Sequence, residues 1–394
     1  MSSYSVILKA RRTPIGSFLG NFSSLSASDL ASFVIKDLLK DKRLNPNMIN
    51  EIILGNVLSA GQGQAPARQA ALKGGCTNSI EALTINKMCG SGLKAVMLAD
   101  QTLRAGDSDI ILAGGMESMS NAPHLHLNSR KGTRLGHSEV VDSLVHDGLW
   151  DVYTQQHMGS CAELLVSKRG YSRQGQDKFA IKSYSKALNA IANNIFKNEI
   201  VPISHIDRKG NNTLIEEDEE PSKANLDKIP LLKAAFNKKG TITAANASTL
   251  NDGAAVLLIT NELMAEKLGI EPLAKIVAHA SVAHEPEWFT SAPGKAITKV
   301  LAKANMPSEK IDLWEINEAF AAVTMAVIDD FEISSEKVNI YGGAVALGHP
   351  IGSSGARILT TLLNGMENRK VKNGLATLCI GGGEASAIII EKYD

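Results

Sequence analysis

A lone cysteine stands directly before Gly-Ser-Gly in the stretch NKMCGSGLKAV, residues 86–96, where the pattern becomes helical. A cysteine at the first turn of a helix feels the positive end of the helix dipole, which lowers the pKa of its thiol. Neighbouring glycines let a substrate approach and let backbone N–H groups face an oxyanion. Cys89 is therefore a candidate nucleophile. The alternative is a structural role, since free cysteines are among the most buried residue types.

Three further residues could do chemistry. His349 lies in a glycine-rich run, GGAVALGHPIGSSGAR, before a predicted helix, where an imidazole could act as a general base. Cys379 ends an apolar strand and meets three glycines in LCIGGGE. Asn317 ends a strand in EINEAFAA, where it could donate a hydrogen bond or hold a water, or only cap the next helix.

The composition is that of a soluble globular protein. The 394 residues suggest two or three domains, 44% of them are apolar, and the formal net charge is zero. With no overall field, nucleic acid is not an expected partner. The sequence shows no membrane span, signal sequence or paired CxxC, so we expect a cytoplasmic protein with reduced thiols.

The elements that carry these residues occur twice along the chain. Residues 46–57 and 307–319 each run from a proline through a polar step into an apolar strand that ends near an asparagine. Residues 89–115 and 351–383 each read as a glycine-rich turn, a helix, a strand and more glycines. The two offsets, about 261 and 263 residues, predict a duplicated strand-helix unit. Related halves stacked about a pseudo-twofold axis would bring Cys89 together with His349 and Cys379.

A long insertion interrupts the first half. In the second half, an apolar strand follows the glycines at 381–383 directly. In the first half, the glycines at 114–115 have no such strand after them, and the matching strand begins only at Gly253. Residues 116–250 are therefore interpreted as an insertion. We predict one αβα half over residues 1–115 plus 251–270, an inserted loop domain over 116–250, and a second αβα half over 271–394. Alternating strands and helices predict an α/β fold with parallel-rich sheets. The acidic run IEEDEE, residues 215–220, is expected on a solvated face.

A series of motifs makes the sequence recognisable. NKMCGSGLKAV, AGGMESMSNAP, HMGSCAE, GTITAANASTLNDGAA, NEAFA, GGAVALGHPIGSSGAR and CIGGGEASA follow one another in the order of the thiolase family, which the chain resembles nearly from end to end. The resemblance implies duplicated αβαβα layers with an inserted loop domain. It implies that Cys89 forms an acyl thioester, His349 activates Cys89, and Cys379 is the acid and base of the carbon–carbon step.

The resemblance also implies two oxyanion holes and a coenzyme A site. His349 with a water held by Asn317 would form one hole, and the amides of Cys89 and Gly381 the other. The CoA contacts would come mainly from the insertion: Leu149, His157, Met158, Lys223, Phe236, Ala244 and Ser248, with Phe320 opposite. Lys223 would act as a point charge where relatives carry an arginine.

The implied activity is the reversible condensation of two acetyl-CoA to acetoacetyl-CoA plus CoA, without metal or redox cofactor. One alternative is a degradative 3-ketoacyl-CoA thiolase of broader chain length. A ketoacyl synthase is disfavoured by Cys379, and a non-catalytic acyl-CoA binder by the intact set of reactive residues. Met158, with Trp288 and Phe289 in HEPEWFTSAP, is expected to crowd the acyl pocket and favour short chains. Residues 124–139 lie where some relatives carry a tetramerisation loop, so a homodimer or homotetramer is expected.

Overall fold

The structure is a computed structural model that describes residues 4–206 and 212–393. Its strands are β1 (Ser5–Arg12), β2 (Gly16–Ser17), β3 (Glu51–Gly55), β4 (Glu81–Ile85), β5 (Ile110–Ser118), β6 (His124–His126), β7 (Val140–Asp142), β8 (Trp150–Asp151), β9 (Gln156–His157), β10 (Ile203–Ile206), β11 (Asn212–Ile215), β12 (Asn251–Asn261), β13 (Ala274–Ala283), β14 (Leu313–Ile316), β15 (Asn373–Ile380) and β16 (Glu384–Lys392). Its α-helices are α1 (Ala27–Leu38), α2 (Pro66–Lys73), α3 (Ser91–Ala105), α4 (Ser143–Gly148), α5 (Met158–Arg169), α6 (Arg173–Ala192), α7 (Glu219–Lys223), α8 (Glu262–Leu268), α9 (Ala292–Ala304), α10 (Ala321–Phe331), α11 (Ala344–Leu347) and α12 (Ser354–Arg369).

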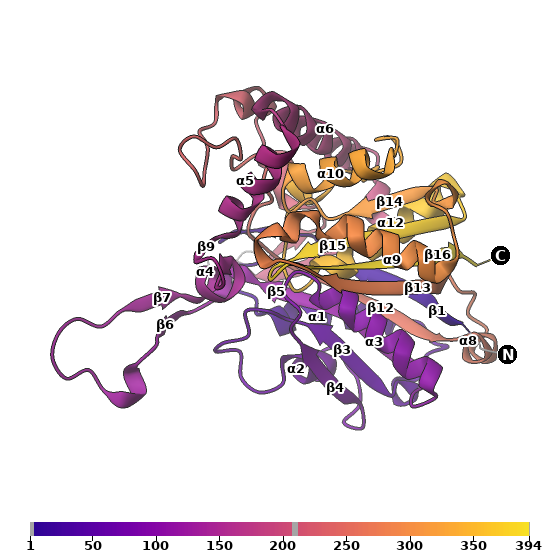
Figure 1. The fold of residues 1–394 in the computed structure, drawn as a ribbon. Helices are drawn as coiled ribbons and strands as arrows, with labels where there is room; N and C mark the ends of the chain where they lie inside the picture. The colour runs from indigo at the N-terminus through magenta and orange to yellow at the C-terminus, as the bar shows by residue number, and fades with distance from the viewer. Residues whose placement is uncertain (1–3, 207–211, 394) are drawn as a thin grey trace.

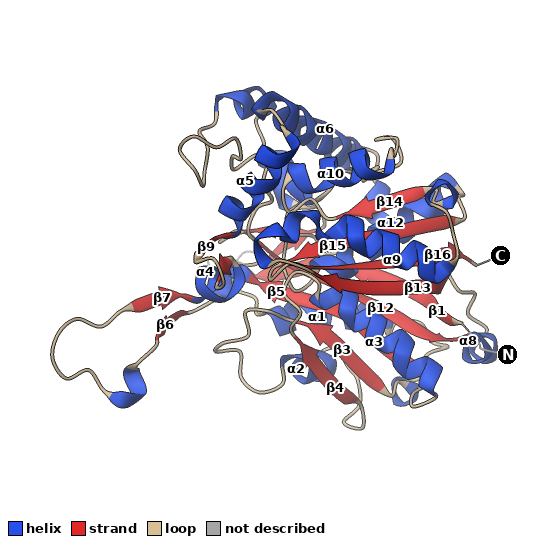
Figure 2. Cartoon of the chain, in the orientation of Figure 1, coloured by secondary structure: helices blue, strands red, loops and turns tan. Residues whose placement is uncertain are grey.

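The central sheet repeats one strand order in both halves of the chain. Its order is β14-β15-β16-β13-β1-β12-β5-β3-β4, so β3, β5, β12 and β1 correspond to β14, β15, β16 and β13. The halves meet where β1 pairs with β13 over a short register, Val6 with Lys275 and Ile7 with Ala274. Figures 1 and 2 show this sheet running through the body with helices on both faces. The strand order matches the duplication predicted from the sequence offsets.

Helices and strands alternate in five layers. The apolar faces of α3 and α12 share one buried core with strands from both halves of the sheet, so these two helices form the middle layer. Helices α1 and α2 cover the outer face of the first half, and α9 with α10 covers that of the second half. Local sequence supports these helices: Ser26 and Asp29 form a capping box that begins α1. The predicted duplicated αβαβα fold is therefore confirmed.

The prediction of parallel-rich sheets is wrong in detail. Parallel pairing occurs between β3 and its neighbours β4 and β5, and between β14 and β15. The pairs at the centre, including β5 with β12 and β15 with β16, are antiparallel. For β15 and β16 the physical reason is the connection, because β15 returns directly into β16 through a tight glycine turn, which permits only an antiparallel neighbour.

The inserted residues leave the sheet after β5 and return to it at β12. These two strands pair along almost their whole length, from Asp252 with Ser118 to Thr260 with Ile110, so the long excursion does not separate them. Between them lie α4 to α7 and a two-stranded arm, β6 with β7, that projects from the body in Figure 1. The three domain boundaries stay a prediction, and their residues 1–3, 207–211 and 394 lie outside the described ones. Within the described chain, no helix is long and apolar enough to cross a membrane.

Candidate active site

The two halves touch closely at the start of their middle-layer helices. A Cβ placed on Gly92, near the start of α3, would lie 2.9 Å from the backbone nitrogen of Ala356 in α12. A Cβ on Gly90 would lie 2.3 Å from the Cδ1 atom of Ile380, at the end of β15. A side chain at position 92 would press on the backbone of the other half, and one at position 90 would require the Ile380 side chain to move. This contact brings the turn that carries Cys89 to the strand that carries Cys379.

Cys89 lies on a tight turn two residues before α3, and not in the first turn of that helix as predicted. The preceding residue, Met88, has φ of +47°, which is uncommon for a residue with a side chain. Ser91 holds the turn, because its hydroxyl donates to the Met88 carbonyl at 2.6 Å and accepts the Lys87 N–H at 2.8 Å. The thiol of Cys89 consequently lines the cavity while its backbone is fixed on both sides.

The expected low pKa of Cys89 is not found. Burial raises the pKa of this thiol to about 11, and the nearby Glu117 carboxylate acts in the same direction. The backbone N–H groups of Gly381 and of Cys89 itself oppose this shift, because they hydrogen-bond the sulfur and favour its thiolate. Desolvation outweighs these two donors, so the resting residue is a neutral thiol. The same two amides are those predicted for an oxyanion hole.

His349 is buried and neutral. Burial, and to a smaller extent the neighbouring Arg357 guanidinium, lower its pKa to about 3. The backbone N–H of His349 donates to Asn251 Oδ1 at 2.8 Å, and its Nδ1 lies 2.6 Å from the Ser354 hydroxyl. That hydroxyl donates to the Pro350 carbonyl at 2.9 Å, so it accepts from Nδ1–H. Nε2 is then the unprotonated nitrogen, and it has no hydrogen-bond partner among the described residues.

Cys379 and Asn317 come from the second half of the chain. Cys379 is fully buried at the end of β15 and lines the same cavity as Cys89 and His349. Burial, and then the proximity of Cys89, raise the pKa of Cys379 well above its ordinary value. Asn317 does not line the cavity. It is fully buried two residues before Ala319, which does, and its side-chain amide has no hydrogen-bond partner in the described part of the chain.

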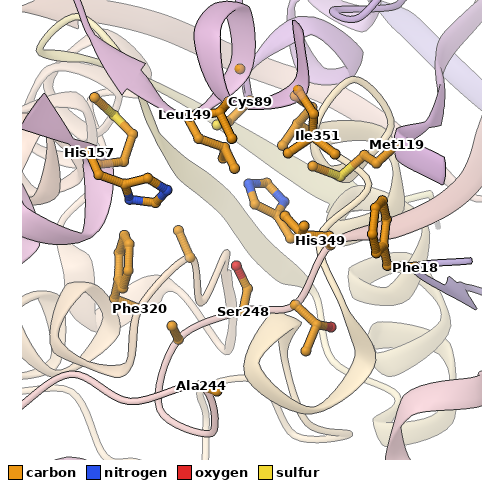
Figure 3. A pocket seen from close by; sticks show the side chains of 18 of the residues that line it. Phe18, Cys89, Met119, Leu149, His157, Ala244, Ser248, Phe320, His349 and Ile351 are labelled. Atoms are coloured by element: carbon orange, nitrogen blue, oxygen red, sulfur yellow. The ribbon is translucent and has the colours of Figure 1, made fainter. Parts of the chain in front are cut away.

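One cavity of about 700 Å³ collects the predicted residues (Figure 3). Cys89, His349, Cys379 and Gly381 line it, together with every predicted CoA contact: Leu149, His157, Met158, Lys223, Phe236, Ala244, Ser248 and Phe320. His157 stacks on Phe236 with ring centroids 4.8 Å apart, and Phe320 meets Phe236 edge to face at 6.1 Å. His157 and Phe236 of the inserted segment and Phe320 of the second half therefore form one side of the cavity, the aromatic wall, opposite the turn that carries Cys89.

Of two predictions about the cavity, the CoA contact of Lys223 stays a prediction, whereas the position expected for Trp288 is wrong. Lys223 lines it, but its ammonium is already engaged, donating to Ser17 Oγ at 2.8 Å and to Glu219 Oε1 at 2.6 Å. Phe289 lines the cavity as expected, whereas Trp288 does not. The Lys168 ammonium lies 4.5 Å from the centroid of the Trp288 ring. The indole therefore packs against α5, and Phe289 lines the cavity instead of Trp288.

Glu117 is a functional candidate that sequence reasoning missed. Its buried carboxylate, at the end of β5, accepts the backbone N–H groups of Val57, Leu58 and Gly352 and the side-chain amide of Asn56, at 2.8 to 3.2 Å. Gly352 belongs to the loop of His349, so this one carboxylate ties that loop to two strands of the other half. Burial raises the pKa of Glu117 to about 7. The sequence does carry a signal for Glu117, because it places a carboxylate inside the otherwise apolar strand IILAGGMES.

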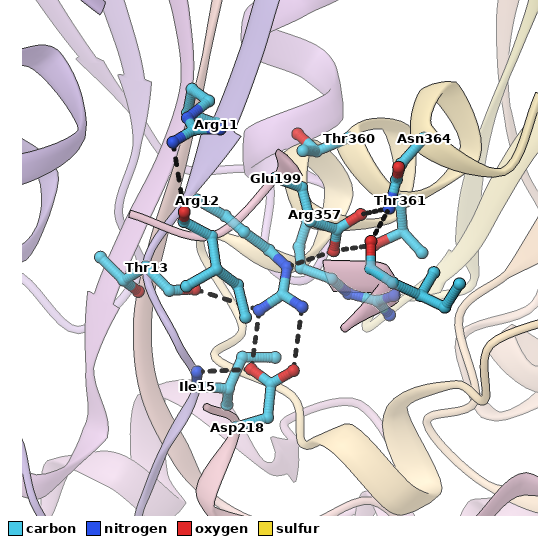
Figure 4. Close-up of polar contacts among 12 residues, drawn as sticks. Arg11, Arg12, Thr13, Ile15, Glu199, Asp218, Arg357, Thr360, Thr361 and Asn364 are labelled. Atoms are coloured by element: carbon cyan, nitrogen blue, oxygen red, sulfur yellow. Dashed lines mark hydrogen bonds and ion pairs between the residues drawn. The ribbon is translucent and has the colours of Figure 1, made fainter. Parts of the chain in front are cut away.

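A buried ionic network anchors the inserted segment (Figure 4). The guanidinium of Arg12 makes two hydrogen bonds with Asp218, at 2.7 and 2.9 Å, and a third with Glu199 at 2.6 Å. Glu199 in turn accepts from Thr361 and Asn364 of α12. The expectation of a solvated acidic run is therefore wrong at its centre, since Asp218 is 2% exposed. Its desolvation is offset by a fully paired arginine.

The chain was compared with protein families, curated proteins and solved structures. Residues 5–263 match the thiolase N-terminal domain and residues 270–392 the thiolase C-terminal domain. A probable acetyl-CoA acyltransferase of Staphylococcus aureus is 49% identical over 98% of this chain and 99% of its own. The acetyl-CoA acetyltransferase of Bacillus anthracis superposes with a TM-score of 0.96 at 38% identity, covering 99% of both chains. A thiolase of Ascaris suum in complex with coenzyme A superposes with a TM-score of 0.93 at 42% identity, covering 99% of this chain and 100% of that one. With family matches over almost its whole length, this chain belongs to the thiolase family.

Proposed function

We propose that this chain is an acetyl-CoA acetyltransferase that interconverts two acetyl-CoA with acetoacetyl-CoA plus free CoA. The reaction proceeds by a ping-pong route through a thioester on Cys89. The observation that best supports this proposal is the shared cavity. The thiols of Cys89 and Cys379, one from each half of the chain, line it together with the neutral imidazole of His349, whose Nε2 has no hydrogen-bond partner among the described residues. Covalent catalysis divides the difficult Claisen condensation into two easier steps.

In the first step, Cys89 attacks the carbonyl of acetyl-CoA. Since burial disfavours both the free thiolate and the imidazolium, we propose that His349 Nε2 takes the thiol proton as the sulfur attacks, rather than in a preceding equilibrium. The charge on the carbonyl oxygen is stabilised by the N–H groups of Cys89 and Gly381. CoA leaves as a thiol with the proton of Cys379, so Cys379 becomes the thiolate that the second step requires, while His349 keeps the proton of Cys89.

In the second step, a new acetyl-CoA loses a proton from its methyl group. We propose that the Cys379 thiolate is the base, and that the resulting carbanion attacks the acetyl group on Cys89. The enolate oxygen is stabilised by His349 and by a water that the Asn317 amide holds. The buried amide of Asn317, free of partners among the described residues, supports this assignment. Cys89 leaves as acetoacetyl-CoA forms and recovers its proton from His349, while Cys379 keeps the proton of the methyl group, so all three residues return to their neutral states.

Coenzyme A is proposed to lie along the aromatic wall. Its pantetheine arm would run past His157, Phe236 and Phe320, with Leu149, Met158, Ala244 and Ser248 completing the channel. A similar structure, the Ascaris suum thiolase, is a complex with coenzyme A. Lys223 is proposed to contact a CoA phosphate only after its ammonium has released the Glu219 carboxylate.

A trapping experiment tests this function. The enzyme is incubated with acetyl-CoA, quenched in acid and digested, and the acetylated residue is located by mass spectrometry. Acetylation of Cys89 is expected, and Cys89→Ala should lose turnover by several orders of magnitude. Cys379→Ala should still acetylate Cys89 slowly while losing deuterium exchange at the acetyl methyl group. Acetyl on Cys379 or Cys161 with Cys89 unmodified would refute the proposal, and CoA binding without any adduct would favour a non-catalytic acyl-CoA binder.

The assembly is proposed to be a homo-oligomer, with the β6–β7 arm as the contact that would extend a dimer to a tetramer. The arm projects from the body, and the side chains of residues 127–139 are exposed in this single chain. Light scattering on the intact protein and on a variant with residues 127–139 replaced by a short linker distinguishes the two states. A tetramer that survives the deletion contradicts this role of the arm.

A further inference from the structure

Two turns, one from each half of the chain, contribute the N–H groups that hydrogen-bond the sulfur of Cys89. One N–H belongs to Cys89 itself, and the other belongs to Gly381 in the turn between β15 and β16. An ion pair joins these two turns, because the Lys87 ammonium donates to the Glu384 carboxylate. The side chains of Lys87 and Glu384 are 22% and 33% exposed, and neither lines the cavity. The pair therefore links the two turns from outside the substrate site.

The backbone of Lys87 is tied to that of Cys89. The Lys87 N–H donates to Ser91 Oγ at 2.8 Å, and the Lys87 carbonyl accepts the Gly90 N–H at 3.0 Å. Met88, between Lys87 and Cys89, has φ of +47°, a conformation that costs energy for a residue with a side chain. A strained turn of this kind persists only while its surroundings hold it. A displacement of Lys87 would therefore move the Cys89 N–H as well.

Glu384 is tied to the second donor, Gly381, in a similar way. It is the first residue of β16 and pairs with Ile380, the last residue of β15, across a turn of three glycines. The Gly383 carbonyl accepts the His284 N–H at 2.9 Å, which holds the turn to the residue that follows β13. Glycines contribute no side-chain packing. The position of the Gly381 N–H therefore depends on these backbone contacts and on the contact of Glu384 with the other half.

We propose that Lys87 and Glu384 are positioning residues for the oxyanion hole formed by the N–H groups of Cys89 and Gly381. Their ion pair holds the two turns at the separation at which both N–H groups donate to one oxygen of the attacked thioester. An oxyanion hole acts only while its donors keep this geometry, because their hydrogen bonds strengthen as the charge develops. This inference rests on the proposed function, because it needs Cys89 to be the acylated residue.

A second ion pair on the same sheet provides a matched comparison. Lys275 of β13 lies 3.0 Å from Glu391 of β16, and their side chains are 26% and 18% exposed, much like those of the first pair. Glu391 follows Glu384 by seven residues along β16, about 23 Å, so the second pair lies near the other end of that strand. Partly exposed ion pairs contribute little to stability, because solvent screens them. The two pairs should therefore differ in their effect on catalysis and not in their effect on folding.

Single-turnover kinetics test this inference. Acetylation of Cys89 by acetyl-CoA is followed by rapid quenching and mass spectrometry for the wild type, Lys87→Met and Glu384→Gln, with Lys275→Met and Glu391→Gln as controls. A double variant that exchanges the charges, Lys87→Glu with Glu384→Lys, tests whether the contact itself matters. Alkylation of Cys89 by iodoacetamide, which forms no oxyanion, is measured on the same proteins. Thermal unfolding compares the stability of each variant with that of its control.

Lys87→Met and Glu384→Gln should each acetylate Cys89 about tenfold more slowly than the wild type, less than the loss caused by removing a donor of the hole altogether. The KM for acetyl-CoA should change little, since neither residue lines the cavity. The double variant should recover the rate to within about threefold of the wild type. Alkylation should change by less than about threefold throughout, because it needs the thiolate of Cys89 but not the hole. Lys275→Met and Glu391→Gln should acetylate Cys89 at the wild-type rate.

Equal acetylation rates in Lys87→Met and Lys275→Met overturn the inference and leave the proposed function intact, whereas a wild type that does not acetylate Cys89 overturns both. Equal losses of acetylation and alkylation would show that Lys87 acts on the thiol and not on the hole, which refutes the positioning role. A double variant that stays as slow as the single variants would refute it as well.

Discussion

The Ser354 hydroxyl holds the imidazole of His349 in a single tautomer. Its oxygen lies 2.6 Å from Nδ1 and donates its own hydrogen to the Pro350 carbonyl, so only Nε2 carries a free lone pair. Ser354 belongs to the first turn of α12, and the middle-layer packing of that helix fixes its place. Ser354 is thus a positioning residue, one that acts through the imidazole and not on the substrate.

Ser354→Ala should lower kcat by about tenfold to a hundredfold, because the imidazole can then rotate or adopt the wrong tautomer. The KM for acetyl-CoA should change little, since Ser354 does not line the cavity. Steady-state kinetics separate the two parameters. Ser354→Thr keeps the hydroxyl and should restore most of the rate. A change confined to KM would show that the serine acts on substrate binding instead.

Alkylation of Cys89 by iodoacetamide should accelerate steadily between about pH 7 and 10. The pKa of this thiol is raised by burial from 9.0 to about 11, so the thiolate fraction increases tenfold per pH unit throughout this range. Rates are followed by mass spectrometry of the Cys89 peptide. The same peptide in urea, with an ordinary thiol, should level off near pH 9. A plateau below pH 8 in the folded enzyme would indicate a preformed thiolate–imidazolium pair.

Glu117→Gln should destabilise the protein by about 1 to 3 kcal/mol and also lower kcat. A carboxylate accepts all four N–H groups, whereas the glutamine NH₂ would face donors and leave them unsatisfied. Urea unfolding gives the free energy, and turnover of acetoacetyl-CoA gives kcat. Glu336→Gln, at a glutamate whose side chain is 75% exposed, serves as control. Equal stability of the two variants would show that Glu117 does not hold the loop of His349 in place.

Asp218→Asn should cost about 3 to 5 kcal/mol of unfolding free energy, because it leaves the fully buried Arg12 without its bidentate partner. Glu217→Gln changes the adjacent, exposed residue of the same acidic run and should be nearly neutral. Thermal and urea unfolding compare the pair. If both variants behave alike, the Arg12 network does not anchor the inserted segment.

Much of the site was predictable because its chemistry is local in the sequence. Cys89, His349, Cys379 and Gly381 each stand beside glycines at the end of a strand or the start of a helix, and this pattern by itself indicates reactive backbone turns. The repeat offsets of about 261 residues, together with the internal position of the insertion, predicted the symmetric strand order. The ordered family motifs indicated the CoA contacts, and all of them line the cavity.

Other properties depend on distant residues and were decided only by the tertiary structure. The neutral state of Cys89 follows from desolvation by both halves, which outweighs the local helix end that the sequence displays. Asp218 is buried because Arg12, about two hundred residues earlier, lies opposite it, whereas charge patterning alone predicts a solvated run. Glu117 gains its role from loops that meet across the two halves. The burial of a side chain and its ionic partners depend on residues from distant parts of the chain, so they cannot be predicted from a local stretch of sequence.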